Sequence, residues 1–255
     1  MIGRMVKTFA AVASVTLLGV ACAGGERVSP TGQAGNPTTP AQVIEPIDLP
    51  PLPPQGIVVQ EGTEVTLVGL EGLVIVHLLG FELANPSDPP GVVLLMKGDQ
   101  TYLLRVDGNR LQPVTASRAE HLAVRDDRQV NLPLPHGVPV TDGDPAGHWR
   151  WARSSPDGTW VLAQWSGECE VPKAFMVGSD DGVPQPVTGE WGLRHGSESI
   201  GLGWTAGGKA LIDLPVGYCG GSAKRPGAYL FARPGAAVLV YPHPQGTLVR
   251  MWGTA

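Results

Sequence analysis

The chain has 255 residues, of which 35 are glycine and 25 are proline, and only 16% are charged. Its 18 basic and 23 acidic side chains give a net charge of −5, which argues against nucleic acid as a partner. The frequent glycines and prolines argue against long helices and favour short strands joined by turns.

The first 21 residues have the layout of a secretory signal peptide. Arg4 and Lys7 supply the positive charge, and an apolar run from Thr8 to Val20 follows. This run is too short to span a bilayer as a helix, which takes about 20 apolar residues. We therefore predict that residues 1–21 are a signal peptide.

The segment that ends at Cys22 resembles a bacterial lipoprotein signal. Val20 and Ala21 suit that pattern, whereas Gly19 stands where leucine is usual. The resemblance implies cleavage before Cys22 and a lipid on its thiol. The protein would then be anchored at the extracytoplasmic face of the bacterial cell membrane. The alternative is a cleaved signal peptide in which the cysteine is incidental.

The cysteine count fits this expectation. Besides Cys22, the chain contains only Cys169 and Cys219, which can pair if Cys22 is acylated. Closing a loop of this length with a disulfide would stabilise the fold by roughly 3–4 kcal/mol. The alternatives are two unpaired thiols or a metal-binding pair, although no histidine lies close to either cysteine in the sequence.

Residues 22–56 are expected to form a disordered tether. The segment is rich in proline and glycine, its apolar residues show no period, and five prolines fall between Pro46 and Pro54. An ordered arm over residues 40–56 is the alternative. Residues 57–255 are long enough for one domain with a sizeable core.

The first part of this domain contains short apolar runs separated by turn residues, which predict strands and hairpins. The run from Leu73 to Leu79 fits either a buried strand or a short helix, and His77 within it is expected to be a core histidine. The predicted strand regions are Ile57–Val59, Glu64–Leu70, Leu73–Leu83, Gly91–Lys97 and Thr101–Val106.

An internal repeat covers the second part of the chain. Four pairs match at an offset of 50: Gly158 with Gly208, Val161 with Leu211, Leu162 with Ile212, and Cys169 with Cys219. Three more match at an offset of 54: Phe175 with Tyr229, Val177 with Phe231, and Val187 with Tyr241. Residues 102–115 resemble residues 175–188 more weakly. A period near 50 in an all-strand pattern suggests the blades of a propeller.

The turn Ser155-Pro156-Asp157-Gly158 and the later Asp181-Gly182 resemble motifs of the TolB-like β-propeller family. Ser154 stands where the family has tryptophan, whereas Trp204 keeps the tryptophan but is followed by a different turn. The resemblance implies an all-β, propeller-like domain of about four blades, or an incomplete propeller. A β-sandwich is the alternative.

Three tryptophans are candidate binding residues. Trp149, Trp165 and Trp191 have no aromatic counterpart at the repeat offset, so packing symmetry between blades does not require them. Exposed aromatic side chains often anchor partners. At least one of the three is expected to be exposed near a loop-rich face. Because tryptophan is large and often only half-buried, ordinary packing is the alternative.

Motifs for catalysis or metal binding are weak. His195 to Ser199 contains histidine, serine and acid, but there is no G-x-S-x-G motif. The acidic loop from Asp142 to Gly147 lacks the full set of calcium ligands. No cofactor and no metal are therefore expected.

The sequence favours a cell-envelope lipoprotein with a non-catalytic binding domain. Its expected partner, besides the membrane itself, is an envelope protein or a cell-wall polysaccharide. The alternatives are an extracytoplasmic hydrolase on a propeller scaffold and a structural accessory subunit of an envelope complex.

Overall fold

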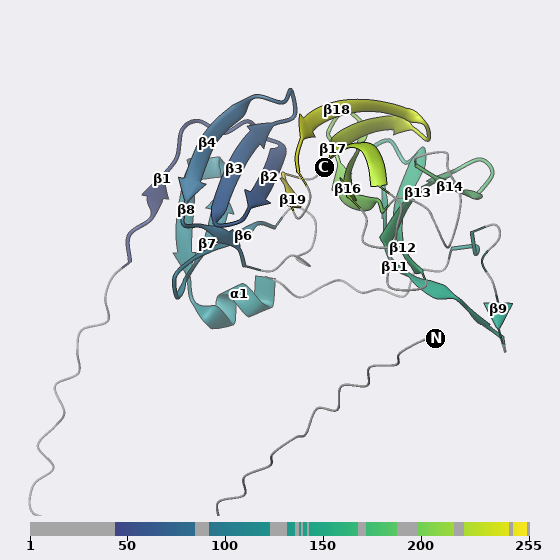
Figure 1. The fold of residues 1–255 in the computed structure, drawn as a ribbon, viewed down its shortest axis with the longest axis horizontal. Helices are drawn as coiled ribbons and strands as arrows, with labels where there is room; N and C mark the ends of the chain where they lie inside the picture. Colours follow the sequence, from purple (N-terminus) through teal and green to yellow (C-terminus); the bar gives the residue numbers. More distant parts are fainter. Residues whose placement is uncertain are drawn as a thin grey trace, which may run out of the picture. The chain divides into compact units, whose positions relative to one another are not determined.

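The computed structural model describes residues 44–84, 92–122, 132–135, 138, 140–141, 143–167, 172–187, 198–216, 222–244 and 247–253. Residues 43–255 form one compact unit. The described part consists of antiparallel sheets with one short α-helix (Figure 1). The expected all-β fold class is confirmed.

Four sheets of four or five strands make up most of the described part. The first contains, in spatial order, β19 (Leu248–Trp252), β2 (Gly56–Glu61), β3 (Glu64–Gly69) and β4 (Val74–Leu79). The second contains β1 (Ile47–Asp48), β8 (Arg110–Val114), β7 (Gln100–Arg105), β6 (Leu94–Lys97) and β5 (Glu82–Leu83). The third contains β11 (Gly147–Ser154), β12 (Trp160–Gly167), β13 (Pro172–Gly178) and β14 (Pro184–Pro186). The fourth contains β15 (Ile200–Trp204), β16 (Ala210–Val216), β17 (Ser222–Arg233) and β18 (Ala236–Pro242).

Three smaller elements complete the described part. Strands β9 (Val140–Thr141) and β10 (Asp144–Pro145) form a two-stranded ribbon. A 3₁₀ turn, η1 (Val106–Gly108), separates β7 from β8, and helix α1 (Ala116–Leu122) follows β8.

Most strands pair with their neighbours in the sequence, because tight turns join them. In the β6–β7 hairpin, for example, Lys97 is opposite Gln100 and the turn is Gly98-Asp99, with Gly98 at a φ of 58°. Two strands break this order. The short strand β1 pairs with β8, and β19, near the end of the chain, pairs with β2.

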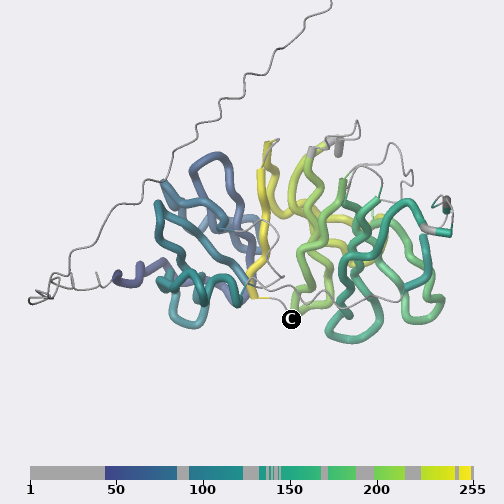
Figure 2. Tube along the Cα trace, turned by 90° about the horizontal axis from the view of Figure 1, so that it is seen from below, coloured from purple at the N-terminus to yellow at the C-terminus, as the bar shows by residue number. Residues whose placement is uncertain are grey.

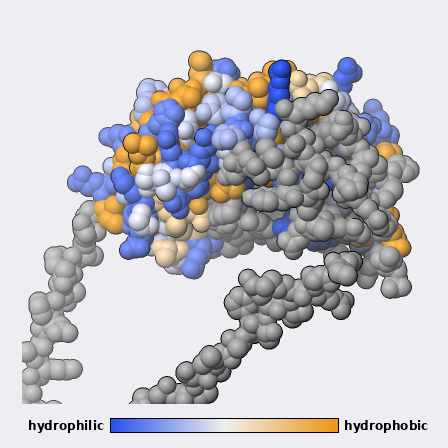
Figure 3. All heavy atoms as spheres, in the orientation of Figure 1, coloured by the Kyte–Doolittle hydropathy of each residue, from blue (hydrophilic) through white to orange (hydrophobic). Residues whose placement is uncertain are grey.

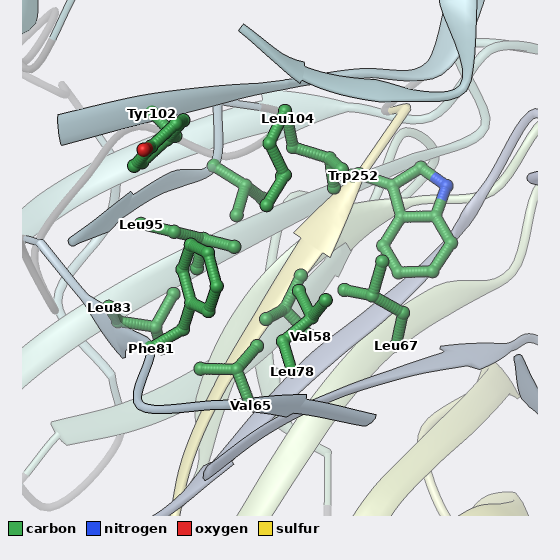
Figure 4. Close-up of a cluster of buried hydrophobic side chains, with 12 residues drawn as sticks. Val58, Val65, Leu67, Leu78, Phe81, Leu83, Leu95, Tyr102, Leu104 and Trp252 are labelled. Atoms are coloured by element: carbon green, nitrogen blue, oxygen red, sulfur yellow. The ribbon is translucent and has the colours of Figure 1, made fainter. Parts of the chain in front are cut away.

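The two central strands of the first sheet, β2 and β3, contribute side chains to cores on both faces of the sheet. In β2, the side chain of Val58 belongs to a core shared with the second sheet, whereas Ile57 and Val59 belong to a core shared with the fourth sheet. Successive side chains of a strand point to opposite faces, so the run Ile57–Val59 of β2 is apolar at every position. Figure 4 shows the core between the first and second sheets, where Leu67 and Trp252 face Leu104.

A third core joins the third and fourth sheets and includes Leu162, Met176, Trp204 and Ile212. Within the described ranges, the cores therefore link the second sheet to the first, the first to the fourth, and the fourth to the third. In Figure 2, the purple-to-teal segments of the first and second sheets lie on one side of the yellow C-terminal segment, and the green segments of the third and fourth sheets lie on the other. No buried cluster among the described residues joins the second sheet to the third.

Residues 44–55 form an arm that packs against the sheets. The folded domain therefore begins before residue 57, the boundary predicted from the sequence. Asn109, the one non-glycine residue at positive φ in the described part, holds this arm. Its backbone oxygen accepts a hydrogen bond from Leu49 N at 2.7 Å, and its side-chain oxygen accepts one from Leu52 N at 2.7 Å. The carbonyl of Pro53 accepts a hydrogen bond from Trp252 Nε1 at 3.1 Å.

The internal repeat corresponds to equivalent positions in the third and fourth sheets. Gly158 and Gly208 both have a φ of 72° and close turns between the first and second strands of their sheets. In each turn the glycine N–H donates to a backbone oxygen three residues earlier, at 3.0 Å, that of Ser155 or Thr205. The weaker match between residues 102–115 and 175–188 also aligns equivalent strands of two sheets. Tyr102 lies on β7 of the second sheet, and Phe175 lies on β13 of the third sheet.

The expectation of a core histidine at His77 is wrong. Residues 74–79 form strand β4 at the edge of the first sheet, and 55% of the His77 side chain is exposed. Its Nδ1 lies 2.6 Å from the carboxylate of Glu64 on β3. The apolar run predicts burial of this histidine, but β4 is an edge strand and leaves one of its faces in solvent.

A candidate binding groove beside a buried His–Asp pair

Asp213 is a buried acidic residue within an apolar strand. Strand β16 reads Ala-Leu-Ile-Asp-Leu-Pro-Val, and residue Asp213 is 2% exposed. The neighbouring strands place Ile200 on one side of it and Ala228 on the other. A buried carboxylate is costly unless it is paired, and His243 supplies the partner.

His243 follows directly after β18, and its side chain is fully buried. Nε2 lies 2.7 Å from Oδ1 of Asp213, and Nδ1 lies 3.2 Å from the carbonyl oxygen of Pro244. A neutral imidazole has one N–H donor, whereas an imidazolium has two. Because both ring nitrogens face acceptors, the geometry favours an imidazolium that donates to both.

The pKa values of the two groups agree with this arrangement. Burial alone would lower the pKa of His243, but the hydrogen bond to Asp213 and its negative charge raise the pKa above the ordinary value. Burial raises the pKa of Asp213, and the opposing effects of His243 and of the charge on Arg250 are smaller. Both shifts mean that the folded pair holds protons more tightly than the separate groups do.

An open groove of about 490 Å³ lies beside this pair. Its walls come from the start of β17, from β18 and from the segment after β18. The lining residues are Arg225, Pro226, Leu239, Pro242, His243 and Pro244. Ligand sites are commonly 300–1,000 Å³ in volume, mostly apolar and fitted with a few polar groups. The groove has this volume and an apolar lining, but it is open to solvent and not enclosed.

Hydrogen bonds fix the groove walls. The carbonyl of Arg225 accepts a hydrogen bond from the Tyr229 hydroxyl at 2.7 Å, and that of Pro244 accepts one from the Thr247 hydroxyl at 2.8 Å. At Gly227, a Cβ would lie 2.6 Å from the Tyr241 carbonyl oxygen and 2.8 Å from the side chain of Leu239. Glycine at this position therefore lets β18 lie close to β17.

The predicted tryptophan site is only partly described. Trp165 is fully buried, so it does not present an exposed anchor. Trp149 is half-buried, and its ring lies edge-to-face against Trp165 at 5.1 Å and Phe175 at 5.4 Å between centroids. Trp191 lies outside the described residues. The two described members thus pack together.

The indole N–H groups of Trp149 and Trp165 are both buried, and neither has a hydrogen-bond partner in the described part of the chain. Other tryptophans differ in this respect. Trp204 is 2% exposed, and its Nε1 donates to the Arg153 carbonyl at 2.8 Å. Most buried polar groups have a partner, so the first two are exceptions.

Several predicted sites lie outside the described residues. These are Cys22 with its lipid, the proposed disulfide between Cys169 and Cys219, His195 and Asp142. Within the described ranges, no group of three or more His, Cys, Asp or Glu side chains could hold a metal ion. The same part of the chain contains no helix with the length and hydropathy needed to cross a membrane.

Sequence reasoning missed the His–Asp pair. The two residues are 30 positions apart and belong to no known motif. The available signal was the single acid in the otherwise apolar β16, since such a residue requires a buried partner. Nothing local indicated that His243 would provide it.

Comparisons with known proteins identify no relative: no family model, no curated protein and no solved structure matches the chain. The functional argument therefore depends on the residues and their geometry.

Proposed function

We propose that the protein is a lipid-anchored, extracytoplasmic binding protein of the bacterial cell envelope, and that the groove beside His243 is its ligand site. The observation that carries the binding proposal is the groove itself. Apolar residues line most of it, an exposed cation stands at Arg225, and a buried ion pair braces one wall. An envelope protein or a cell-wall component is the proposed partner.

The geometry of His243 favours binding over hydrolysis. In a catalytic triad, one ring nitrogen of the histidine contacts the acid and the other accepts the proton of the nucleophile. In this protein one nitrogen contacts Asp213 and the other faces the Pro244 carbonyl. No ring nitrogen remains available as a general base, so the pair is proposed to have a structural role.

We further propose that the four sheets are the blades of a β-propeller-like domain. The support is the meander order within each sheet, the equivalent turns at Gly158 and Gly208, and the completion of the first sheet by β19. Propellers commonly carry binding sites on their blades and connecting loops.

Cell fractionation tests the anchor. In a bacterial host, the wild-type protein is expected in the membrane fraction, labelled by a radioactive fatty acid. Cys22→Ala should remove the label and release the protein or block its processing. Unchanged labelling and membrane association after this substitution would overturn the lipid-anchor proposal.

Site-specific photocrosslinking tests the groove in cells. A photoreactive amino acid at Leu239, which lines the groove, should give a discrete crosslinked product. The same amino acid at Met96, an exposed apolar position on the second sheet, serves as the matched control. Equal crosslinking at the two positions would contradict the assignment of the groove.

A further inference from the structure

We infer that the groove binds the free C-terminal end of an extended polypeptide whose last residue is apolar, with Arg225 receiving the terminal carboxylate. This inference rests on the proposed function, because it names the ligand class of the same site. Four features of the groove support it: its charge, its apolar walls, its open shape and the rigidity of its walls.

The charge of the groove is set by Arg225. Its side chain is exposed, and the described residues give it no acidic partner. The nearest acid on the neighbouring strand, Asp213, is already paired with His243. A guanidinium presents two parallel N–H groups that match the two oxygens of a carboxylate. Among the described residues, no acidic side chain therefore neutralises the positive charge at the rim of the groove.

The remaining lining residues offer apolar surface. Leu239 and the rings of Pro226, Pro242 and Pro244 contribute no side-chain hydrogen-bonding group. His243 directs both ring nitrogens to partners within the protein. An apolar side chain beside the carboxylate would therefore leave none of these lining side chains without a hydrogen bond. Its burial would stabilise the complex by about 25 cal/mol for each Å² of apolar surface removed from water.

The shape of the groove favours the end of a chain over a small molecule. Its volume of about 490 Å³ accommodates an apolar side chain and a carboxylate, but it is wide open to solvent. A small ligand that must bury most of its surface would be poorly enclosed. A polypeptide can place its last residue in the groove while the preceding residues continue into solvent, a recognised mode of peptide capture.

The walls are rigid before any ligand binds. Three prolines have fixed φ angles, and hydrogen bonds hold the backbone at Arg225 and Pro244. Rigid walls reduce the entropy lost on binding. The groove can therefore select a short segment even though its area is small.

Fluorescence anisotropy with a pair of peptides tests the inference. The probe is a fluorescein-labelled hexapeptide, Gly-Ser-Gly-Ser-Val-Leu, with either a free C-terminal carboxylate or a C-terminal amide. The protein is the full chain purified in detergent. The free acid is expected to bind at least tenfold more tightly than the amide, and the difference should shrink as salt is added.

Two variants locate the effect. Arg225→Gln should weaken binding of the free acid at least tenfold and make acid and amide equal, while Arg225→Lys should recover part of the loss. Arg110→Gln, at an exposed arginine on the second sheet, is the matched control and should leave binding unchanged. Thermal unfolding of each variant should match wild type, because both arginines are exposed.

Three results would overturn the inference. Equal binding of acid and amide, weakened by Leu239→Ala, would mean that the groove takes peptides without reading the carboxylate, and the proposed function would stand. Displacement of the peptide by decanoate at lower concentrations than by unlabelled peptide would point to a lipid source. If no groove variant changes peptide binding and Leu239 gives no crosslink, the groove is not the ligand site and the proposed function is wrong as well.

Discussion

Two pairs of buried polar side chains in neighbouring sheets differ in one respect. In the fourth sheet, both ring nitrogens of His243 have hydrogen-bond partners: Oδ1 of Asp213 at 2.7 Å and the Pro244 carbonyl oxygen at 3.2 Å. In the third sheet, the indole N–H groups of Trp149 and Trp165 have no partner among the described residues. The comparison shows that burial alone does not identify a stabilising polar group. The effect on stability depends on whether removing the group leaves a buried partner without its hydrogen bond, or removes a donor that had no hydrogen bond.

The largest expected effect comes from breaking the satisfied pair. Asp213→Ala leaves a buried histidine without its partner, which should reduce the free energy of unfolding by about 3–5 kcal/mol. Urea denaturation measures the change. Asp99→Ala, at an exposed turn residue, is the matched control and should stay within about 0.5 kcal/mol of wild type. A loss below about 1 kcal/mol at Asp213 would show that the pair does not brace the fold.

Varying the pH tests the same pair without removing either side chain. The pKa of His243 is raised in the folded state, so its stabilising contribution is complete below about pH 6.5 and is lost as the pH rises through the folded value. The raised pKa of Asp213 acts in the same direction. The free energy of unfolding should therefore fall as the pH rises from about 6.5 through the folded-state pKa of His243.

A double variant provides the control for the pH experiment. Asp213→Leu with His243→Leu removes both titrating groups and fills the space with apolar atoms, which often preserves stability. Its unfolding free energy should change less with pH than that of wild type over the same range. An unchanged slope would assign the pH dependence to other groups.

Replacing tryptophans tests whether a buried indole N–H without a hydrogen-bond partner contributes less to stability than one with a partner. Trp204→Phe removes an indole that donates to Arg153, so a carbonyl loses its partner. Trp165→Phe removes a donor that has no partner among the described residues. Both lose similar volume, so Trp204→Phe should cost about 1 kcal/mol more than Trp165→Phe. Equal losses by thermal unfolding would mean that the two indoles are equivalently satisfied.

The smallest effect is expected at an exposed pair of the same chemical types. His77 and Glu64 are 2.6 Å apart, but their side chains are 55% and 42% exposed. Water already solvates both groups, and a surface pair contributes about 0–1 kcal/mol. Glu64→Gln should therefore change the unfolding free energy by less than about 1 kcal/mol. A loss comparable to that of Asp213→Ala would contradict the role assigned to burial.

The sequence predicted what local chemistry determines. The runs Glu64–Leu70 and Thr101–Val106 form β3 and β7, because glycine-containing turns delimit them. The repeat at an offset of 50 identified equivalent turns, because the same left-handed glycine is needed at Gly158 and Gly208. The all-β class followed from these local signals.

Features that depend on distant residues could not be predicted. Strand β1 pairs with β8, more than 60 residues later, so the sequence around β1 alone predicts a tether and not an ordered arm. The His243–Asp213 pair depends on the register of β16, β17 and β18, and no periodicity within one strand reveals that register. The burial of Trp165 likewise depends on cross-strand neighbours, because Trp149 lies directly opposite it.

The pairing of β19 with β2 has a consequence for the order of folding during synthesis. Met251 is opposite Ile57, so the first sheet lacks one of its strands until almost the whole described chain has been made. Until then, the apolar face of β2 toward the fourth sheet lacks Val249 and Met251. Non-local pairing of this kind slows folding and prolongs exposure of apolar surface. Nascent chains that stop before Leu248 should therefore depend on chaperones much more than the finished protein does.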